Sequence, residues 1–186
     1  MVMGILTDGI NEVIATTRRN AAPMGIILRE GKFRMVCFTG SHTADNIARD
    51  RWVVANIIHD PVMYVTTAFS DLADDAFYEE RINDIPVYRL ADAEAYIAFS
   101  AIIEHRGSES MSVRLVPICE KVVTCKPHPV NRGFASIIEA TIHTTRYRMN
   151  HDPHLKGLID HHTAIVRKCG GTRELEALRL LESFIG

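Results

Sequence analysis

The sequence lacks the long apolar run that a membrane-spanning helix requires. No uninterrupted hydrophobic stretch approaches the ~20 residues that cross a bilayer. The amino-terminal segment MVMGILTDGINE also has no basic cluster followed by a long apolar core, so it is unlike a signal peptide. We therefore expect a cytoplasmic protein that does not enter a membrane.

A strong charge of one sign and paired cysteines are also missing. The formal net charge of −2 predicts no electrostatic attraction to nucleic acid or acidic lipid. The four cysteines, Cys37, Cys119, Cys125 and Cys169, show no paired spacing, so we expect reduced thiols. Cys37 lies in an apolar strand pattern without a nearby basic activator and is expected to be inert.

The motifs of several large enzyme classes are absent. The sequence contains no GxSxG elbow, no Walker-type phosphate loop, no HExxH zinc motif and no dinucleotide-binding fingerprint. No residue stands out as a general acid or base, so the catalytic residues remain unassigned. The 186 residues suffice for one sizeable core, or for a core with a small helical addition.

Extended segments dominate the first two thirds of the chain. β-Branched and alternating apolar residues predict strands at residues 12–17, 23–28, 33–38, 52–58 and 62–68. A short helix capped by Ser41 or Thr43 is expected to run to about Arg49. A solvated helix or helical turn is expected at residues 71–80, and a short extended piece at 87–90. Residues 92–105 fit both a helix and a strand, although the polar tip at 106–110 makes a hairpin attractive.

The composition changes after the stiff link Lys126-Pro-His-Pro129. Asn131 can cap a helix expected to run to about Met149. A second helix follows from about Leu155 until Gly170-Gly171 stops it, and Thr172 caps a last one. The sequence thus predicts a β-rich body over residues 1–129 and a helical subdomain over residues 130–186.

Two segments have the chemistry of a ligand site. The run Asn20-Ala-Ala-Pro-Met-Gly25 has small side chains and a proline, which let a flat ligand lie against bare backbone. The run Gly40-Ser-His-Thr43 begins a helix with unpaired N–H groups and hydroxyls, which suits a phosphate. An ordinary capped helix and turn in a ligand-free barrel explain the same residues.

These motifs, with Ser41-x-Thr-x-x-Asn-Ile47, Val53-Val-Ala-Asn56 and the segment 132–146, resemble a known group of proteins. The group is the flavin-reductase-like branch of the FMN-binding split barrels. The sequence is more closely similar to a functionally unassigned family of archaea and methylotrophic bacteria with a helical C-terminal part. The resemblance implies a mainly β fold with α, a split β-barrel of the FMN-binding type followed by a small helical subdomain. It also favours the hairpin after residue 92.

The resemblance further implies FMN as cofactor. Asn20 to Gly25 would face the flavin ring, Ser41 and Thr43 with Asn46 behind them would take the phosphate, and Asn56 would meet the ring or ribityl chain. Arg18 would compensate the phosphate charge, with Arg19 as an equal contender. His143 and Arg146, one turn apart in the first C-terminal helix, complete the expected set. The simpler interpretation is an exposed polar row with Glu139, whose side chains pair with one another. The set is Arg18, Asn20, Ala21, Ala22, Pro23, Met24, Gly25, Ser41, Thr43, Asn46, Asn56, His143 and Arg146.

Four histidines near the C-terminus suggest a metal, but their spacing does not. His151, His154, His161 and His162 match no established ligand pattern. We therefore interpret them as surface and core histidines and expect no metal.

Taken together, these features predict an FMN-dependent oxidoreductase that acts on a small cytoplasmic molecule as a homodimer. The flavin would carry the hydride chemistry at N5, with a nicotinamide or deazaflavin donor stacking on it. The resemblance links the activity by association to pterin-type C1 cofactor biosynthesis. A non-catalytic flavin carrier or sensor, and a flavin-free assembly or metal-binding protein, remain as alternatives.

Overall fold

The computed structural model describes residues 4–185, which divide into two compact units. The barrel unit contains the residues up to Ile58 together with Leu72–Lys126. The helical unit contains His59–Asp71 together with the chain from Pro127 onward. The helical unit is therefore built from two separate stretches, and the domain division at residues 129 and 130 stays a prediction.

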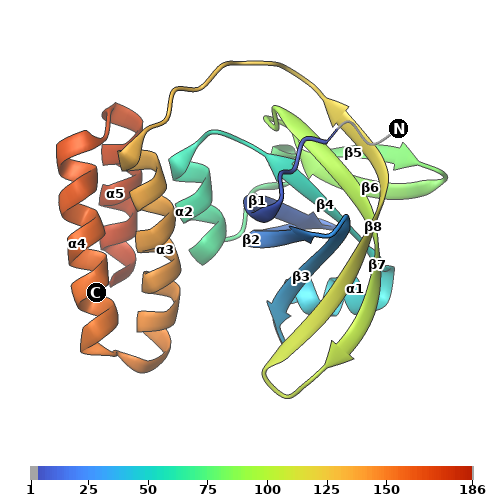
Figure 1. Cartoon of the computed structure of the whole chain (residues 1–186), viewed down its shortest axis with the longest axis horizontal. Coiled ribbons are helices and arrows are strands. Elements are labelled where there is room, and N and C mark those ends of the chain that lie inside the picture. Colours follow the sequence, from blue (N-terminus) through green and yellow to red (C-terminus); the bar gives the residue numbers. More distant parts are fainter. Residues whose placement is uncertain (1–3, 186) are drawn as a thin grey trace. The chain divides into compact units, whose positions relative to one another are not determined.

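The barrel unit is a closed antiparallel barrel in the order β1-β2-β3-β8-β7-β4 (Figure 1). Its strands are β1 (Gly9–Thr17), β2 (Asn20–Arg29), β3 (Lys32–Phe38), β4 (Trp52–Ile57), β7 (Ala95–Arg106) and β8 (Ser110–Val122). Helix α1 (His42–Asp50) connects β3 to β4, and β5 (Phe77–Ile82) and β6 (Ile85–Leu90) form a separate two-stranded sheet. The expected hairpin after residue 92 is confirmed as β7 and β8.

Alternating apolar side chains fill the barrel. Successive residues of a strand point to opposite faces, so every second one enters the interior. Val13 and Ala15 of β1, Ile26 of β2, Met35 of β3 and Phe99 of β7 are all buried in one hydrophobic cluster. The period of two is visible in the sequence of β3, whereas β1, β2 and β4 were predicted from runs of β-branched and apolar residues.

The predicted strand over residues 62–68 is wrong, because this segment forms helix α2 (Pro61–Phe69). Asp60 caps the helix by accepting a hydrogen bond from the Val62 N–H, and Pro61 sits in the first turn, where its fixed φ is favourable. Val65 is buried against α3 and α5. Capping and tertiary packing therefore override the β propensity of this Val- and Thr-rich segment.

The solvated helix or helical turn predicted over residues 71–80 is confirmed only as a short turn, and its second half is wrong. Only Asp74–Ala76 form a 3-10 turn, and Phe77 begins strand β5. Strand pairing with β6 decides the outcome, because it joins Phe77 to Leu90 and Ile82 to Ile85 across a two-residue turn. Tyr96 of β7 donates a hydrogen bond to the Glu80 carboxylate, which ties this small sheet to the barrel.

The helical unit contains α2, α3 (Arg132–Asn150), α4 (Pro153–Cys169) and α5 (Thr172–Ile185). Side chains of Asn131 and Asp152 cap α3 and α4 by accepting backbone N–H bonds. Ile137, Val166 and Leu181 are fully buried in its core. The expected helical C-terminal part is confirmed. No helix within residues 4–185 is long and apolar enough to cross a membrane.

Candidate functional site

Strand β2 has an open backbone edge over its first six residues. β1 pairs with β2 from Asn20 to Leu28, whereas the pairing of β2 with β3 covers only Ile26 to Arg29. In an antiparallel ladder, backbone groups of alternate residues face the same neighbour. Because Thr17 and Asn20 close the two-residue turn, Ala21, Pro23 and Gly25 direct their backbone groups away from β1, toward the unpaired side. Pro23 has no N–H, which is consistent with an open edge.

Helix α1 begins beside this open edge. Ser41 is its N-cap, with an extended backbone, and its hydroxyl accepts a hydrogen bond of 3.2 Å from the Ala44 N–H. The N–H groups of His42 and Thr43 have no carbonyl one turn earlier to accept them, as at every helix start. The helix dipole adds a partial positive charge there.

One hydrogen bond joins the two segments. The Asn20 side-chain amide donates to the Thr43 hydroxyl over 3.1 Å. The open edge of β2 and the start of α1, which lie twenty-three positions apart in the sequence, therefore meet in space. The sequence-based expectation required these two segments to share one cleft, and the hydrogen bond brings them together.

The hydroxyls of Ser41 and Thr43 differ in whether they can still donate a hydrogen bond to a ligand. Ser41 donates to the Phe38 carbonyl over 2.8 Å and accepts from Ala44, so its hydrogen is already committed. Thr43 accepts from Asn20, which leaves its own hydroxyl hydrogen available to donate. Thr43 is 3% exposed, so such a donation occurs at a desolvated position.

Asn46 and Asn56 hold the barrel together. Asn46 donates to the carbonyl and hydroxyl of Thr17 at the end of β1. Asn56 is fully buried, donates to the Ile14 carbonyl and the Thr16 hydroxyl, and accepts from the Leu90 N–H. Direct contact of either amide with a cofactor stays a prediction. Their observed bonds fix β1, the strand that pairs with β2 and its open edge.

Arg18 is committed to an ion pair with Asp50. Its Nε lies 2.6 Å from Asp50 Oδ2 and its Nη2 lies 3.0 Å from Oδ1, which is a bidentate arrangement. Hydrogen bonding to Arg18 lowers the pKa of Asp50 to about 2. A hollow of about 380 Å³ adjoins this pair and is lined by Arg18, Arg19, Asp50, Trp52, Pro86 and Tyr88. Because Arg18 there has a carboxylate partner and Arg19 pairs with Asp74, the hollow offers little uncompensated positive charge.

Two of the expected residues lie in the helical unit. His143 and Arg146 are on α3, with His143 partly buried and Arg146 exposed. Their assignment to the cofactor stays a prediction. Within this unit His143 faces Glu139 and His162, a grouping that the sequence shows only in part, because Glu139 and His143 are four residues apart but His162 comes from α4.

Cys37 has the inert environment expected from its strand position. Its side chain is 3% exposed, and burial raises the pKa of the thiol to about 11. The thiolate is therefore scarce at neutral pH, which argues against a nucleophilic role.

The chain is similar along most of its length to proteins without an assigned activity. Residues 11–124 match the family described as "Protein of unknown function (DUF447) N-terminal domain", and residues 131–183 match "Protein of unknown function (DUF447)". The uncharacterized protein MJ1453 of Methanocaldococcus jannaschii is 24% identical over 192 residues, which covers 92% of this chain and 96% of that protein.

Solved structures extend the similarity to flavin-binding proteins. The FMN-bound protein MM1853 of Methanosarcina mazei, which bears the same DUF447 designation, has a TM-score of 0.89 at 32% identity and 96% coverage of both chains. An FMN-binding protein of Thermus thermophilus with bound p-hydroxybenzaldehyde has a TM-score of 0.50 at 12% identity, over 68% of this chain and 81% of its own. The second similarity concerns the fold alone. The expected fold, a split barrel of the FMN-binding type with a helical C-terminal part, is confirmed.

Proposed function

The chain belongs to the DUF447 family, and from this premise we propose that it binds FMN non-covalently at the junction of β2 and α1. The hydrogen bond between Asn20 and Thr43 is the observation that carries the proposal. It brings an unpaired strand edge and a helix start together, and these are the two surfaces that a flat phosphorylated ring requires. The FMN bound to the similar protein of Methanosarcina mazei supports the same cofactor.

The donor set of this junction fits FMN. The flavin ring has carbonyl oxygens and ring nitrogens that require backbone partners, and the open edge at Ala21, Pro23 and Gly25 supplies backbone groups beside small or flat side chains. The phosphate requires donors and positive potential, which the first N–H groups of α1 and the Thr43 hydroxyl provide. Bound FMN would supply the capacity for hydride transfer at this site.

Six more of the expected residues, all in the barrel unit, act around this core of the site. Ser41 caps α1 and so fixes the direction of its N–H groups, while Asn46 and Asn56 anchor β1 and thereby the strand that carries the edge. Ala22 and Met24 alternate with the edge residues and belong to the same strand. Arg18 acts through Asp50 and the β1–β2 turn rather than as a free cation.

We further propose that the protein is a homodimeric FMN-dependent oxidoreductase for a small molecule. Large apolar side chains of the barrel unit, Val36 at 51% and Phe38 at 63% exposure on β3 and Ile10 at 62% on β1, support a partner surface. A donor of the nicotinamide or deazaflavin class would stack directly on the flavin, since the chain carries no dinucleotide-binding fingerprint of its own. A pterin of C1 metabolism is the first substrate class to examine.

Two measurements on the full chain test these proposals in order. The purified protein is expected to show the visible absorption of an oxidised flavin and to release FMN, identified by mass, on denaturation. A protein that stays colourless after incubation with FMN would overturn the binding proposal. Anaerobic mixing with NADPH, NADH or a reduced deazaflavin is then expected to bleach the flavin rapidly. Reduction that is slow and equal for all donors would instead assign the protein as a carrier.

A further inference from the structure

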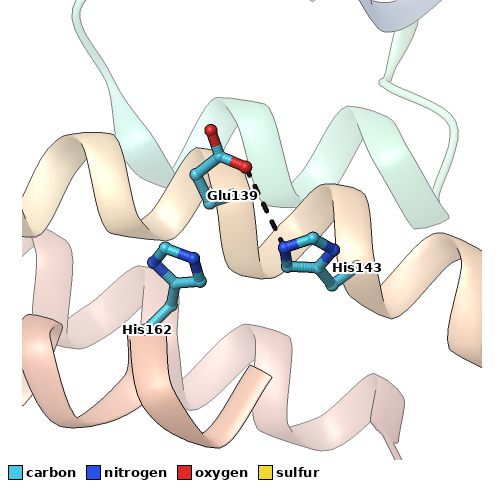
Figure 2. A group of neighbouring side chains, drawn as sticks. All are labelled: Glu139, His143 and His162. Carbon is cyan, nitrogen blue, oxygen red and sulfur yellow. Dashed lines mark ion pairs between the residues drawn. The ribbon is translucent and has the colours of Figure 1, made fainter. Parts of the chain in front are cut away.

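Three metal-ligating side chains meet inside the helical unit. Glu139 and His143 are four residues apart on α3, so they project from the same face one turn apart, and His162 reaches them from α4. One ligand atom of each residue lies within 4.8 Å of those of the other two. Figure 2 shows the three side chains directed toward a shared space between the helices.

The distances within this cluster suit a shared ion better than direct bonds. His143 Nε2 lies 4.0 Å from Glu139 Oε2, which is longer than a hydrogen bond. The rings of His143 and His162 lie with their centroids 5.7 Å apart at an interplanar angle of 30°. Ligand atoms at about 2.0–2.1 Å from a tetrahedral zinc lie roughly 3.4 Å from one another, so side-chain movements on the order of one ångström close the site.

Both imidazoles carry an unsatisfied nitrogen. The Nδ1 atoms of His143 and His162 are buried and have no hydrogen-bond partner among the described residues. Buried polar atoms are normally paired, so neither ring is fixed by a protein hydrogen bond at Nδ1. The nitrogen of His143 that faces Glu139 is Nε2, so Nε2 is the atom of this ring that can bind an ion.

We propose that Glu139, His143 and His162 bind a divalent transition-metal ion, with Zn²⁺ as the best match. Two imidazoles and one carboxylate form a donor set that holds zinc with a further position open to water or a small ligand. The (i, i+4) pairing of Glu139 with His143 alone would not explain why His162 approaches both residues from α4. The site uses one of the four clustered histidines of the sequence and takes its other two ligands from α3, which is why ligand spacing did not reveal it.

Metal counting on the full chain tests the proposal. The protein is stripped with a chelator, incubated with ZnCl₂ and desalted, and the bound zinc is measured by mass spectrometry, with the dissociation constant obtained by competition against a chromogenic chelator. One zinc per chain is expected in the wild type. The double variant His143→Asn/His162→Asn is expected to lose the ion, and each single substitution to weaken binding at least about tenfold.

Two further variants separate metal binding from packing. Glu139→Gln removes a ligand at a side chain that is 54% exposed, so it is expected to fold normally and still to weaken zinc binding. His161→Asn removes an exposed imidazole from the same helix and is expected to bind zinc within about twofold of the wild type, because ordinary surface substitutions change little. Circular dichroism verifies the fold of each variant.

Failure of this inference is distinguishable from failure of the proposed function. A wild type without stoichiometric zinc, or equal zinc uptake by the wild type, Glu139→Gln and the double variant, would overturn the metal site. Flavin absorption reports on the barrel unit, and each of these metal results stands whether or not FMN binds.

Discussion

Asn20 donates its side-chain amide to the hydroxyl of Thr43 across 3.1 Å, and this bond connects the open edge of β2 to the start of α1. A hydroxyl that accepts from an amide keeps its hydrogen for a further acceptor. The bond therefore holds the β2 edge next to the start of α1, and it leaves the hydroxyl hydrogen of Thr43 free to donate. The FMN proposal depends on this geometry.

Thr43→Val is expected to weaken FMN binding by about 1–3 kcal/mol, because it removes a hydrogen bond to a charged phosphate while keeping the side-chain shape. Quenching of flavin fluorescence during titration of cofactor-free protein measures the change in dissociation constant. Thr66→Val is the matched control, since the Thr66 hydroxyl bonds the Val62 carbonyl within α2. Equal affinities for Thr43→Val and the wild type would move the phosphate away from α1.

Asp50 is expected to make the barrel unit sensitive to acid. Its pKa is about 2 in the folded protein and 3.8 for the ordinary side chain. A depressed pKa contributes stability that is complete above the ordinary value and is lost as the pH falls from about 4 through about 2. Urea unfolding at pH 7 and at pH 3 is expected to show a smaller loss of stability for Asp50→Asn than for the wild type. An unchanged acid dependence would mean that the Arg18–Asp50 pair contributes nothing in solution.

The cysteines are expected to differ in reactivity. Cys125 is exposed, whereas burial raises the pKa of Cys37 to about 11. Labelling with a disulfide reagent at pH 8 should therefore show a fast thiol that Cys125→Ser abolishes and Cys37→Ser leaves intact. A fast phase that disappears in Cys37→Ser would contradict the buried position of this thiol.

Two glycines of the helical unit are expected to respond oppositely to alanine. A Cβ at Gly133 would lie 2.6 Å from the Cα of Gly170, so Gly133→Ala should destabilise the unit by about 1–3 kcal/mol through overpacking. A Cβ at Gly157, within α4, meets nothing within 4 Å, so Gly157→Ala should stabilise it by about 0.5–1 kcal/mol. Thermal unfolding followed by circular dichroism compares them, and a Gly133→Ala variant as stable as the wild type would refute the close approach of α3 to Gly170.

The sequence pattern predicted the strands and helices that are determined by residues within the element itself. β3 alternates with a period of two, β1 and β4 are runs of β-branched and apolar residues, and the caps Asn131 and Ser41 begin helices where their residue types indicate. α2 was mistaken for a strand because its β-branched residues are helical only through the Asp60 cap and burial against α3 and α5. β5 was missed because its pairing with β6 depends on residues that come later in the chain.

The residue types of the candidate site were predictable from the sequence, but the hydrogen-bond partners of each residue were not. Sequence indicated that Ser41 and Thr43 carry hydroxyls at a helix start, yet only the bonds to Phe38 and Asn20 show which hydrogen is free. The partner of Arg18 is thirty-two positions away, and the open edge of β2 follows from where its pairing with β3 begins. Each of these features is a relation between distant segments, which a single sequence does not encode locally.

A crystal structure of the full chain loaded with FMN tests the central claim most directly. The account predicts the phosphate within hydrogen-bond distance of the Thr43 hydroxyl and the first N–H groups of α1, with the ring along the edge formed by Ala21, Pro23 and Gly25. A flavin found instead in the hollow between Arg18, Trp52 and Tyr88 would contradict it.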